Sequence, residues 1–166
     1  MLKYFKIEIS KNEESRKEVP MVKKPSIEFA HNFFQAYCIH CRAFCRELRM
    51  PQTAFDILMF LANNPNYNTA KDIVELRGLK ANLVSVNVER LVQEGYLDRQ
   101  DFPGDRRKTV LVCTEKARPV VKKGQELQSS FSEAIFRDVD PDARENFYRV
   151  METVERNLNQ ILKGSE

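Results

Sequence analysis

The segment 69–113 places two short helical patterns directly before two strand-like runs, and this order constrains the fold more than any other feature. Thr69-Ala-Lys-Asp72 has the form of a capping box and opens a short helix with Ile73, Val74 and Leu76 as its apolar residues. Gly78 supplies a turn, and a second helix is predicted from about Lys80 to Glu94, with Gly95 as its cap. Two short helices joined by a tight turn predict a helix-turn-helix.

The period changes after Gly95. Residues 96–100 (Tyr-Leu-Asp-Arg-Gln) and 109–113 (Thr-Val-Leu-Val-Cys) are strand-like. The intervening residues 101–108 contain Pro-Gly and three consecutive cations, and they are predicted to form the loop of a β-hairpin.

Long amphipathic helices are predicted on both sides of this middle. Residues 25–50 carry apolar residues at spacings of three and four, with Pro25 or Ser26 at the start. A second helix follows Pro51 and ends at Asn63-Asn-Pro-Asn66; its predicted inward residues are Phe55, Leu58, Met59 and Leu61.

Beyond the hairpin, Thr114 and Glu115 are predicted to cap a long helix that reaches about Phe136, with Gly124 weakening its middle. Asp140-Pro141 then starts a last helix. This helix carries a narrow apolar stripe of heptad type, formed by Phe147, Val150, Met151, Val154, Leu158 and Ile161.

Charge is unevenly distributed. The net charge is +3, and residues 1–24, which we interpret as a mobile basic arm, hold seven Lys and Arg against four Asp and Glu. The remaining 142 residues are neutral, so bulk charge gives no nucleic-acid signal for the main body. No apolar run is long enough to span a membrane and no secretory signal is recognised, so we expect a cytoplasmic protein with reduced thiols.

From about Phe29 to Leu162 the sequence resembles the MarR (multiple antibiotic resistance regulator) family of winged-helix transcription factors. The most specific part is 83–114: Leu83 to Gly95 resembles the recognition helix, Tyr96 to Arg99 the first wing strand, and Asp105-Arg-Arg107 the wing tip. Lys80 stands where the family often has Ser, Val86 where it often has Arg, and Cys113-Thr-Glu-Lys-Ala117 replaces its Leu-Thr-x-x-Gly.

The resemblance implies a mainly α-helical fold with a small β-hairpin wing, in one continuous domain. Residues 25–50 and 115–166 would form the helical dimerisation region, and 51–114 the winged helix-turn-helix. It also implies a homodimer on pseudo-palindromic double-stranded DNA, with recognition helices in adjacent major grooves and wings at flanking minor grooves.

The residue chemistry agrees with DNA contact. With Val84, Val88 and Leu91 buried, the other face of the recognition helix offers Ala81, Asn82, Ser85, Val86 and Glu89. Asn82 is suited to an adenine edge, Ser85 to a base or phosphate, and Val86 to a thymine methyl. Lys80 and Arg90 suit phosphates. In the wing, Asp105 would orient an arginine, while the cationic run Arg106, Arg107 and Lys108 supplies a group for the minor groove. A solvated charged surface is the alternative.

Cys38, Cys41 and Cys45 share one helix face. A core or dimer face is favoured, and a redox sensor or a soft-metal site completed by Cys113 or a histidine stays open. Family members often bind small aromatic or other anionic effectors, and Phe34, Tyr37, Cys41 and Phe55 are candidates to line such a pocket, although core packing is the simpler assignment. No metal site or cofactor is predicted.

The sequence thus predicts a dimeric DNA-binding regulator, a repressor released by a small effector, and not an enzyme. Three alternatives remain. The same fold could act as a cysteine-based redox or metal sensor, or as a protein-interaction module without DNA binding. The third is a small thiol-redox enzyme that uses Cys38 and Cys41.

Overall fold

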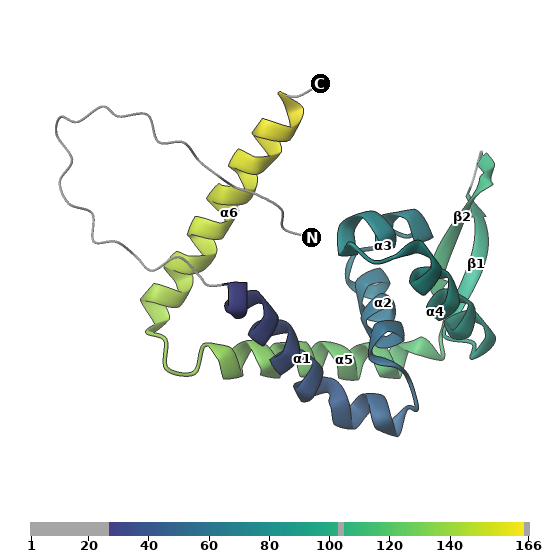
Figure 1. The fold of residues 1–166 in the computed structure, drawn as a ribbon, viewed down its shortest axis with the longest axis horizontal. Coiled ribbons are helices and arrows are strands. Elements are labelled where there is room, and N and C mark those ends of the chain that lie inside the picture. The colour runs from purple at the N-terminus through teal and green to yellow at the C-terminus, as the bar shows by residue number, and fades with distance from the viewer. Residues whose placement is uncertain (1–26, 103–104, 165–166) are drawn as a thin grey trace. The chain divides into compact units, whose positions relative to one another are not determined.

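The computed structural model of the chain describes residues 27–102 and 105–164. Eight elements follow one another (Figure 1): α1 (Ile27–Glu47), α2 (Gln52–Asn63), α3 (Ala70–Arg77), α4 (Ala81–Gln93), β1 (Leu97–Phe102), β2 (Asp105–Cys113), α5 (Ala117–Ile135) and α6 (Pro141–Lys163). The predicted mainly helical fold with one hairpin is confirmed. The basic arm, the helix start at Pro25 or Ser26 and the Pro103-Gly104 pair lie outside the described residues.

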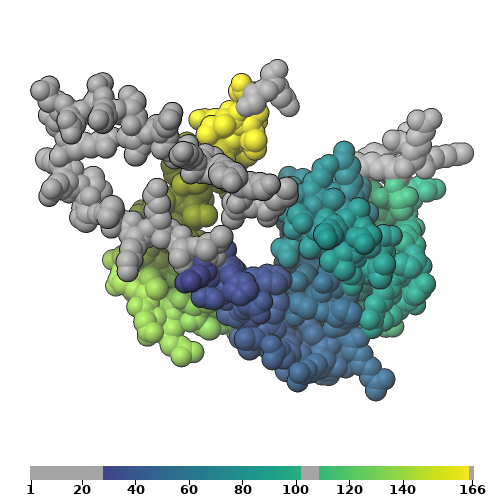
Figure 2. Space-filling view, viewed as in Figure 1, coloured from purple at the N-terminus to yellow at the C-terminus, as the bar shows by residue number. Residues whose placement is uncertain are grey.

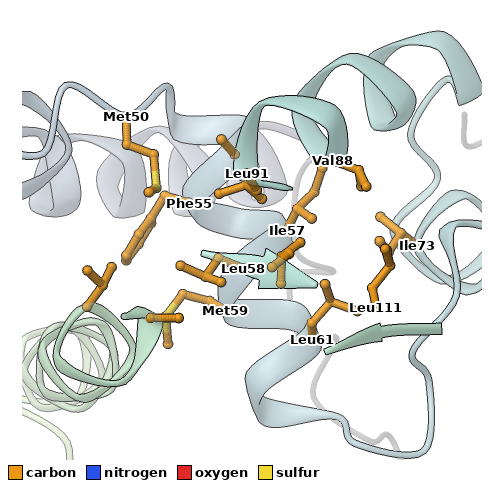
Figure 3. Packing of buried hydrophobic residues seen from close by; sticks show 14 of the residues in the cluster. Met50, Phe55, Ile57, Leu58, Met59, Leu61, Ile73, Val88, Leu91 and Leu111 are labelled. Atoms are coloured by element: carbon orange, nitrogen blue, oxygen red, sulfur yellow. The ribbon is translucent and has the colours of Figure 1, made fainter. Parts of the chain in front are cut away.

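The chain divides into two compact units, residues 1–124 and 125–166. The core of the first unit is built around α2 (Figure 3). The predicted inward residues Phe55, Leu58, Met59 and Leu61 are all buried, as are Val84, Val88 and Leu91 of α4. Ile73 is fully buried from α3, whereas Leu76 is exposed.

The turn between α3 and α4 has the predicted chemistry. The Thr69 hydroxyl accepts the Asp72 N–H (3.1 Å), and an Asp72 carboxylate oxygen accepts the Thr69 N–H (2.8 Å), which completes the capping box. Gly78 ends α3 with φ +63° and Gly95 follows α4 with φ +75°, both in the left-handed region that glycine adopts without steric cost. The helix-turn-helix is therefore fixed at both ends by local interactions.

The hairpin is longer than the sequence indicated. β1 and β2 pair in antiparallel register from Leu97 opposite Cys113 to Asp101 opposite Thr109, and after a bulge Phe102 lies opposite Asp105. The predicted loop at 101–108 is therefore wrong, because strand pairing continues to Phe102 and Asp105. At the base, the Leu111 N–H donates to the Asn68 carbonyl (2.7 Å), which joins the hairpin to the residues before α3.

One prediction about α5, its cap at Thr114 and Glu115, is wrong. The Thr114 hydroxyl donates to the Gly95 carbonyl (2.7 Å) rather than capping the helix, and α5 begins at Ala117. Gly124 does not interrupt α5. A Cβ there would meet the Met59 sulfur and would lie 3.1 Å from Phe55 Cζ, so glycine permits the close approach of α5 to α2.

In the second unit, Asp140 caps α6 as predicted, accepting the N–H groups of Asp142 (3.0 Å) and Ala143 (3.2 Å). Arg144 of α6 forms a two-point ion pair with Glu133 of α5, with nitrogen–oxygen distances of 2.7 and 3.0 Å. Phe136 packs on Phe147 and Tyr148. No helix in the described part of the chain is long and apolar enough to cross a membrane.

Candidate nucleic-acid interface

The outward face of α4 is the one predicted from the sequence. Ala81, Asn82, Ser85 and Glu89 are exposed, and Val86 keeps 69% of its surface open to solvent. An apolar side chain so exposed at the centre of a short helix contributes nothing to the core. Its methyl groups are instead available for apolar contact, as with a thymine methyl.

Asn82 lies in the first turn of α4. Its side-chain carbonyl accepts the backbone N–H of Leu83 (2.9 Å), one of the donors that a helix N-terminus leaves unsatisfied. Lys80 is the N-cap residue and its side chain makes no capping bond. Bidentate reading of an adenine by Asn82 would therefore require the amide to leave its local partner.

Arg90 is held by protein groups. Its Nε donates to the Glu94 carboxylate (2.7 Å), and its Nη2 donates to the Arg49 carbonyl (2.8 Å) in the turn between α1 and α2. Both bonds anchor the C-terminal end of α4. The predicted contact of Arg90 with a phosphate stays a prediction.

An ion pair joins the hairpin to α4. Arg99 of β1 donates to the Glu89 carboxylate (2.8 Å), whose other oxygen accepts the Gln93 amide (3.1 Å). The guanidinium of Arg99 holds the pKa of the Glu89 carboxyl below its usual range. The direction of the hairpin relative to α4 is therefore set by a specific polar contact as well as by its apolar base.

The surface formed by α3, α4 and the hairpin is continuous (Figure 2). It holds a cavity of about 450 Å³ whose lining includes Lys71, Val74, Ala81, Ser85, Arg99 and Thr109. Short side chains from α4 and two cations from its neighbours thus face one concave region. Both cations pair with a carboxylate, Lys71 with Glu75 (3.6 Å), which also lines the cavity, and Arg99 with Glu89 (2.8 Å).

The predicted wing residues Asp105, Arg106, Arg107 and Lys108 belong to β2 and not to a loop. The side chains of residues 102–108 lie outside the part of the chain that the structure describes. Their role in DNA contact stays a prediction.

The cysteines have the character of core residues. Cys41 and Cys45 are buried, and burial, the largest cause, raises the pKa of each thiol, that of Cys45 to about 11. Burial also raises the pKa values of Cys38 and Cys113, which are half-buried. A reactive thiol needs the opposite shift. Within residues 27–102 and 105–164, no three His, Cys, Asp or Glu side chains are grouped to hold a metal ion.

The four residues suggested for an effector pocket differ in their exposure to solvent. Cys41 and Phe55 are fully buried, and Phe55 packs edge-on against Phe44 with ring centroids 6.0 Å apart. Phe34 is half-exposed, and Tyr37 lies at the edge of the core. Apolar packing around α2 closes over Cys41 and Phe55 in the single chain, and the effector pocket stays a prediction.

Two residues that support α4, Asn87 and Lys116, were not predicted from the sequence. Asn87 is buried and its amide donates to the Leu83 carbonyl (2.8 Å). Lys116 donates to the Glu94 carbonyl (2.6 Å) and lies 4.9 Å from the centroid of the Tyr96 ring. Asn87 lies three residues after Val84, at helical spacing with the buried face, which was the one available signal. Nothing local marked Lys116, whose partner is 22 residues away.

A helix-turn-helix followed by an antiparallel hairpin defines a winged-helix protein. Residues 50–108, which cover this region, match the model of the MarR family. No curated protein matches the sequence. Solved structures do, and they include a MarR protein from Peptoclostridium difficile, at 15% identity over 93% of this chain and 100% of that one, with a TM-score of 0.67.

A MarR transcriptional regulator from Methanosarcina mazei has 19% identity over 81% of this chain and 96% of its own, with a TM-score of 0.66. The reduced form of MarR from E. coli has 14% identity, 76% and 93% coverage, and a TM-score of 0.61. These likenesses show the fold. The family model matches residues 50–108, within the stretch over which the sequence resembles the MarR family.

Proposed function

We propose that the chain acts as a homodimer that binds a pseudo-palindromic operator and represses transcription until a small effector releases it. The observation that carries the proposal is the exposed face of α4, with Asn82, Ser85 and Val86 outward beside a hairpin that Arg99 ties to the same helix. A helix presented in this way fits the major groove, and the adjoining hairpin would reach the flanking minor groove.

The last helix supports the homodimer. In the single chain α6 buries no residue, and its heptad stripe from Phe147 to Ile161 is between 42% and 65% exposed. Full burial of a Val or Leu side chain contributes about 1.5–3 kcal/mol, so an equivalent stripe on a second copy would stabilise both helices substantially.

Release would require an effector that binds one arrangement of the two recognition helices more tightly than another. A small aromatic or anionic molecule remains the proposed effector class, and the cytoplasm the proposed location. The near-neutral body implies that geometry, more than bulk charge, supplies affinity for the operator.

Footprinting on the DNA upstream of the chain's own gene tests the proposal. We expect a protected site with two related half-sites about one helical turn apart, and an affinity that falls steeply with salt because counterions are released. Absence of any salt-dependent duplex binding would favour the protein-interaction module and would contradict the proposal.

Arg107→Ala tests the wing. We expect about a tenfold loss of affinity for DNA, because a charge-assisted contact is lost, together with a shallower salt dependence. Dimer mass should not change. Arg118→Ala is the matched control, since Arg118 is exposed, pairs with Glu115 (2.6 Å) and lies outside the α3–α4–hairpin surface. Equal effects of the two substitutions would refute the role of Arg107.

A further inference from the structure

A second cavity, separate from the α3–α4–hairpin surface, lies at the turn between α1 and α2. Its volume is about 490 Å³. Its polar and thiol lining, which we call the arginine pocket, consists of Cys38, Arg42, Cys45, Arg46, Arg49 and Gln52. Met50 and Pro51 complete the wall.

Three guanidiniums give this pocket a strongly positive lining. Arg42 and Arg46 are four residues apart in α1, so they project from one side of the helix, and Arg49 joins them in the lining from the turn that follows. No ion pair joins any of the three to an acidic side chain among the described residues. Arg42 lies close enough to the Cys38 thiol to oppose the rise of its pKa.

The acidic groups nearby do not neutralise the pocket. Asp56 is the carboxylate whose charge acts on Cys38 and Cys45, and it is already hydrogen-bonded by the Gln52 amide (2.9 Å). Glu47 is the one acidic residue between 42 and 49, and it does not line the cavity. Asp56 does not line the cavity either, so the described lining holds three positive side chains and no acidic one.

The start of α2 adds to the positive potential. Pro51 occupies the N-cap position, and no side chain caps the helix there. Backbone N–H groups at an uncapped helix start favour nearby anions. The three arginines are the main source of the positive potential, and the helix terminus adds to it.

We propose that the arginine pocket binds a small oxyanion, either free phosphate or the carboxylate of an organic acid. The planar fork of a guanidinium matches both groups with two parallel hydrogen bonds. A DNA phosphate is disfavoured as the occupant, because the α1–α2 turn lies at the end of the first unit opposite the free end of the hairpin (Figure 1).

The pocket is connected to the recognition helix. Arg49 contributes its side chain to the lining, while its carbonyl accepts the bond from Arg90 of α4 (2.8 Å). Arg49 also has φ +51°, a strained conformation for a residue with a side chain. A ligand that repositions Arg49 therefore acts on the anchor of α4. This consequence, unlike the binding itself, rests on the proposed function.

Isothermal titration calorimetry with sodium benzoate and with inorganic phosphate tests the binding. We expect wild-type protein and the control Arg118→Gln to bind at least one of them. The double variant Arg42→Gln, Arg46→Gln should bind about tenfold more weakly for each arginine lost. Preference for benzoate assigns the pocket to organic acids, and preference for phosphate assigns it to free phosphate. Equal affinity of the double variant and the wild type, or no binding of either anion to the wild type, overturns the proposal.

A thiol measurement locates the ligand in the wild-type chain and does not depend on the folding of a variant. Cys38 lines the pocket and Cys113 does not, and both thiols are half-buried. Saturating anion should slow alkylation of Cys38 by iodoacetamide, measured by peptide mass spectrometry, and leave Cys113 unchanged. Equal effects on both thiols contradict the site. Anion binding without a change in DNA affinity would contradict only the coupling through Arg49. If the protein does not bind DNA at all, that result contradicts the proposed function and not the anion site.

Discussion

At the scale of single residues, the contact between Arg99 and Glu89 makes a testable link between hairpin and recognition helix. Because Arg99 lowers the pKa of Glu89 in the folded chain, the pair stabilises the fold fully above the ordinary pKa of a glutamate. That contribution is lost as the pH falls through the lowered pKa. Urea denaturation between pH 7 and pH 3 should show a smaller acid-induced loss of stability in Glu89→Gln than in wild type.

The control for this pair is Glu75→Gln, which removes the longer, more exposed ion pair with Lys71 (3.6 Å). We expect Glu75→Gln to keep the wild-type pH profile and Glu89→Gln to weaken DNA binding as well, because the hairpin loses its tie to α4. An unchanged profile in Glu89→Gln would show that the ion pair is not formed in solution.

Cys45 provides a second residue-scale prediction. Its thiol is buried, its pKa is raised to about 11, and it lies 3.6 Å from the Gln52 carbonyl. Only the thiolate reacts with alkylating reagents, so at pH 8 we expect Cys45 to remain unmodified in native protein and to react in urea. Half-buried Cys38 is the internal reference. Modification of native Cys45 as fast as Cys38 would restore the redox-sensor alternative.

Side-chain burial along α4 could be predicted, whereas polar partners could not. Val84, Val88 and Leu91 follow a helical period that sequence alone displays, and all three are buried. Arg90 belongs to the same helix, but its bond to the Arg49 carbonyl joins residues 41 positions apart. A pattern within one helix contains no information about such a partner, so the bond of Arg90 to the α1–α2 turn could not be predicted.

At the scale of elements, the hairpin shows the limit of the same reasoning. Apolar alternation marked Thr109–Cys113, and that strand is present. Residues 101–108 are mostly charged and gave no alternation, yet the strands continue to Phe102 and resume at Asp105. Pairing there is driven by backbone hydrogen bonds once the apolar base has fixed the register, so side-chain type carries little signal.

The packing of α5 on α2 depends on Gly124. Alanine would raise the helix propensity of α5 by up to about 1 kcal/mol, but its Cβ would meet the Met59 sulfur and lie 2.9 Å from Met59 Cε. Overpacking of this kind costs about 1–3 kcal/mol, so we expect Gly124→Ala to lower the free energy of unfolding on balance. Chemical denaturation measures the effect.

Met59→Ala tests the cause, because it removes the atoms that the new methyl group would meet. Met59→Ala will itself destabilise the core. Adding Gly124→Ala to it should then cost less than in the wild type, and the two substitutions should be non-additive. If the two changes in the free energy of unfolding add strictly, contact with Met59 is not the reason that position 124 requires glycine.

At the scale of the whole molecule, charge and apolar surface point to different roles for the two units. The first unit holds the α3–α4–hairpin surface, where the segment 69–113 has eight Lys and Arg against seven Asp and Glu. The second unit holds the stripe of α6, whose side chains are between 42% and 65% exposed in the single chain. For the proposed DNA-binding function, so little excess charge makes a second copy useful. Once one recognition helix is bound, the second is held at high effective concentration near its half-site and adds affinity.

Val154→Glu tests this division. Val154 lies in the middle of the stripe, so a carboxylate there would be desolvated in a symmetric contact and repelled by its copy. We expect the dimer to dissociate, as measured by sedimentation equilibrium, while urea denaturation still shows a folded first unit. DNA affinity should fall steeply, because a monomer contacts one half-site. The matched control is Asn159→Glu, which adds the same charge to α6 among residues outside the stripe and should leave the dimer intact. A Val154→Glu protein that stays dimeric would place the dimer interface elsewhere.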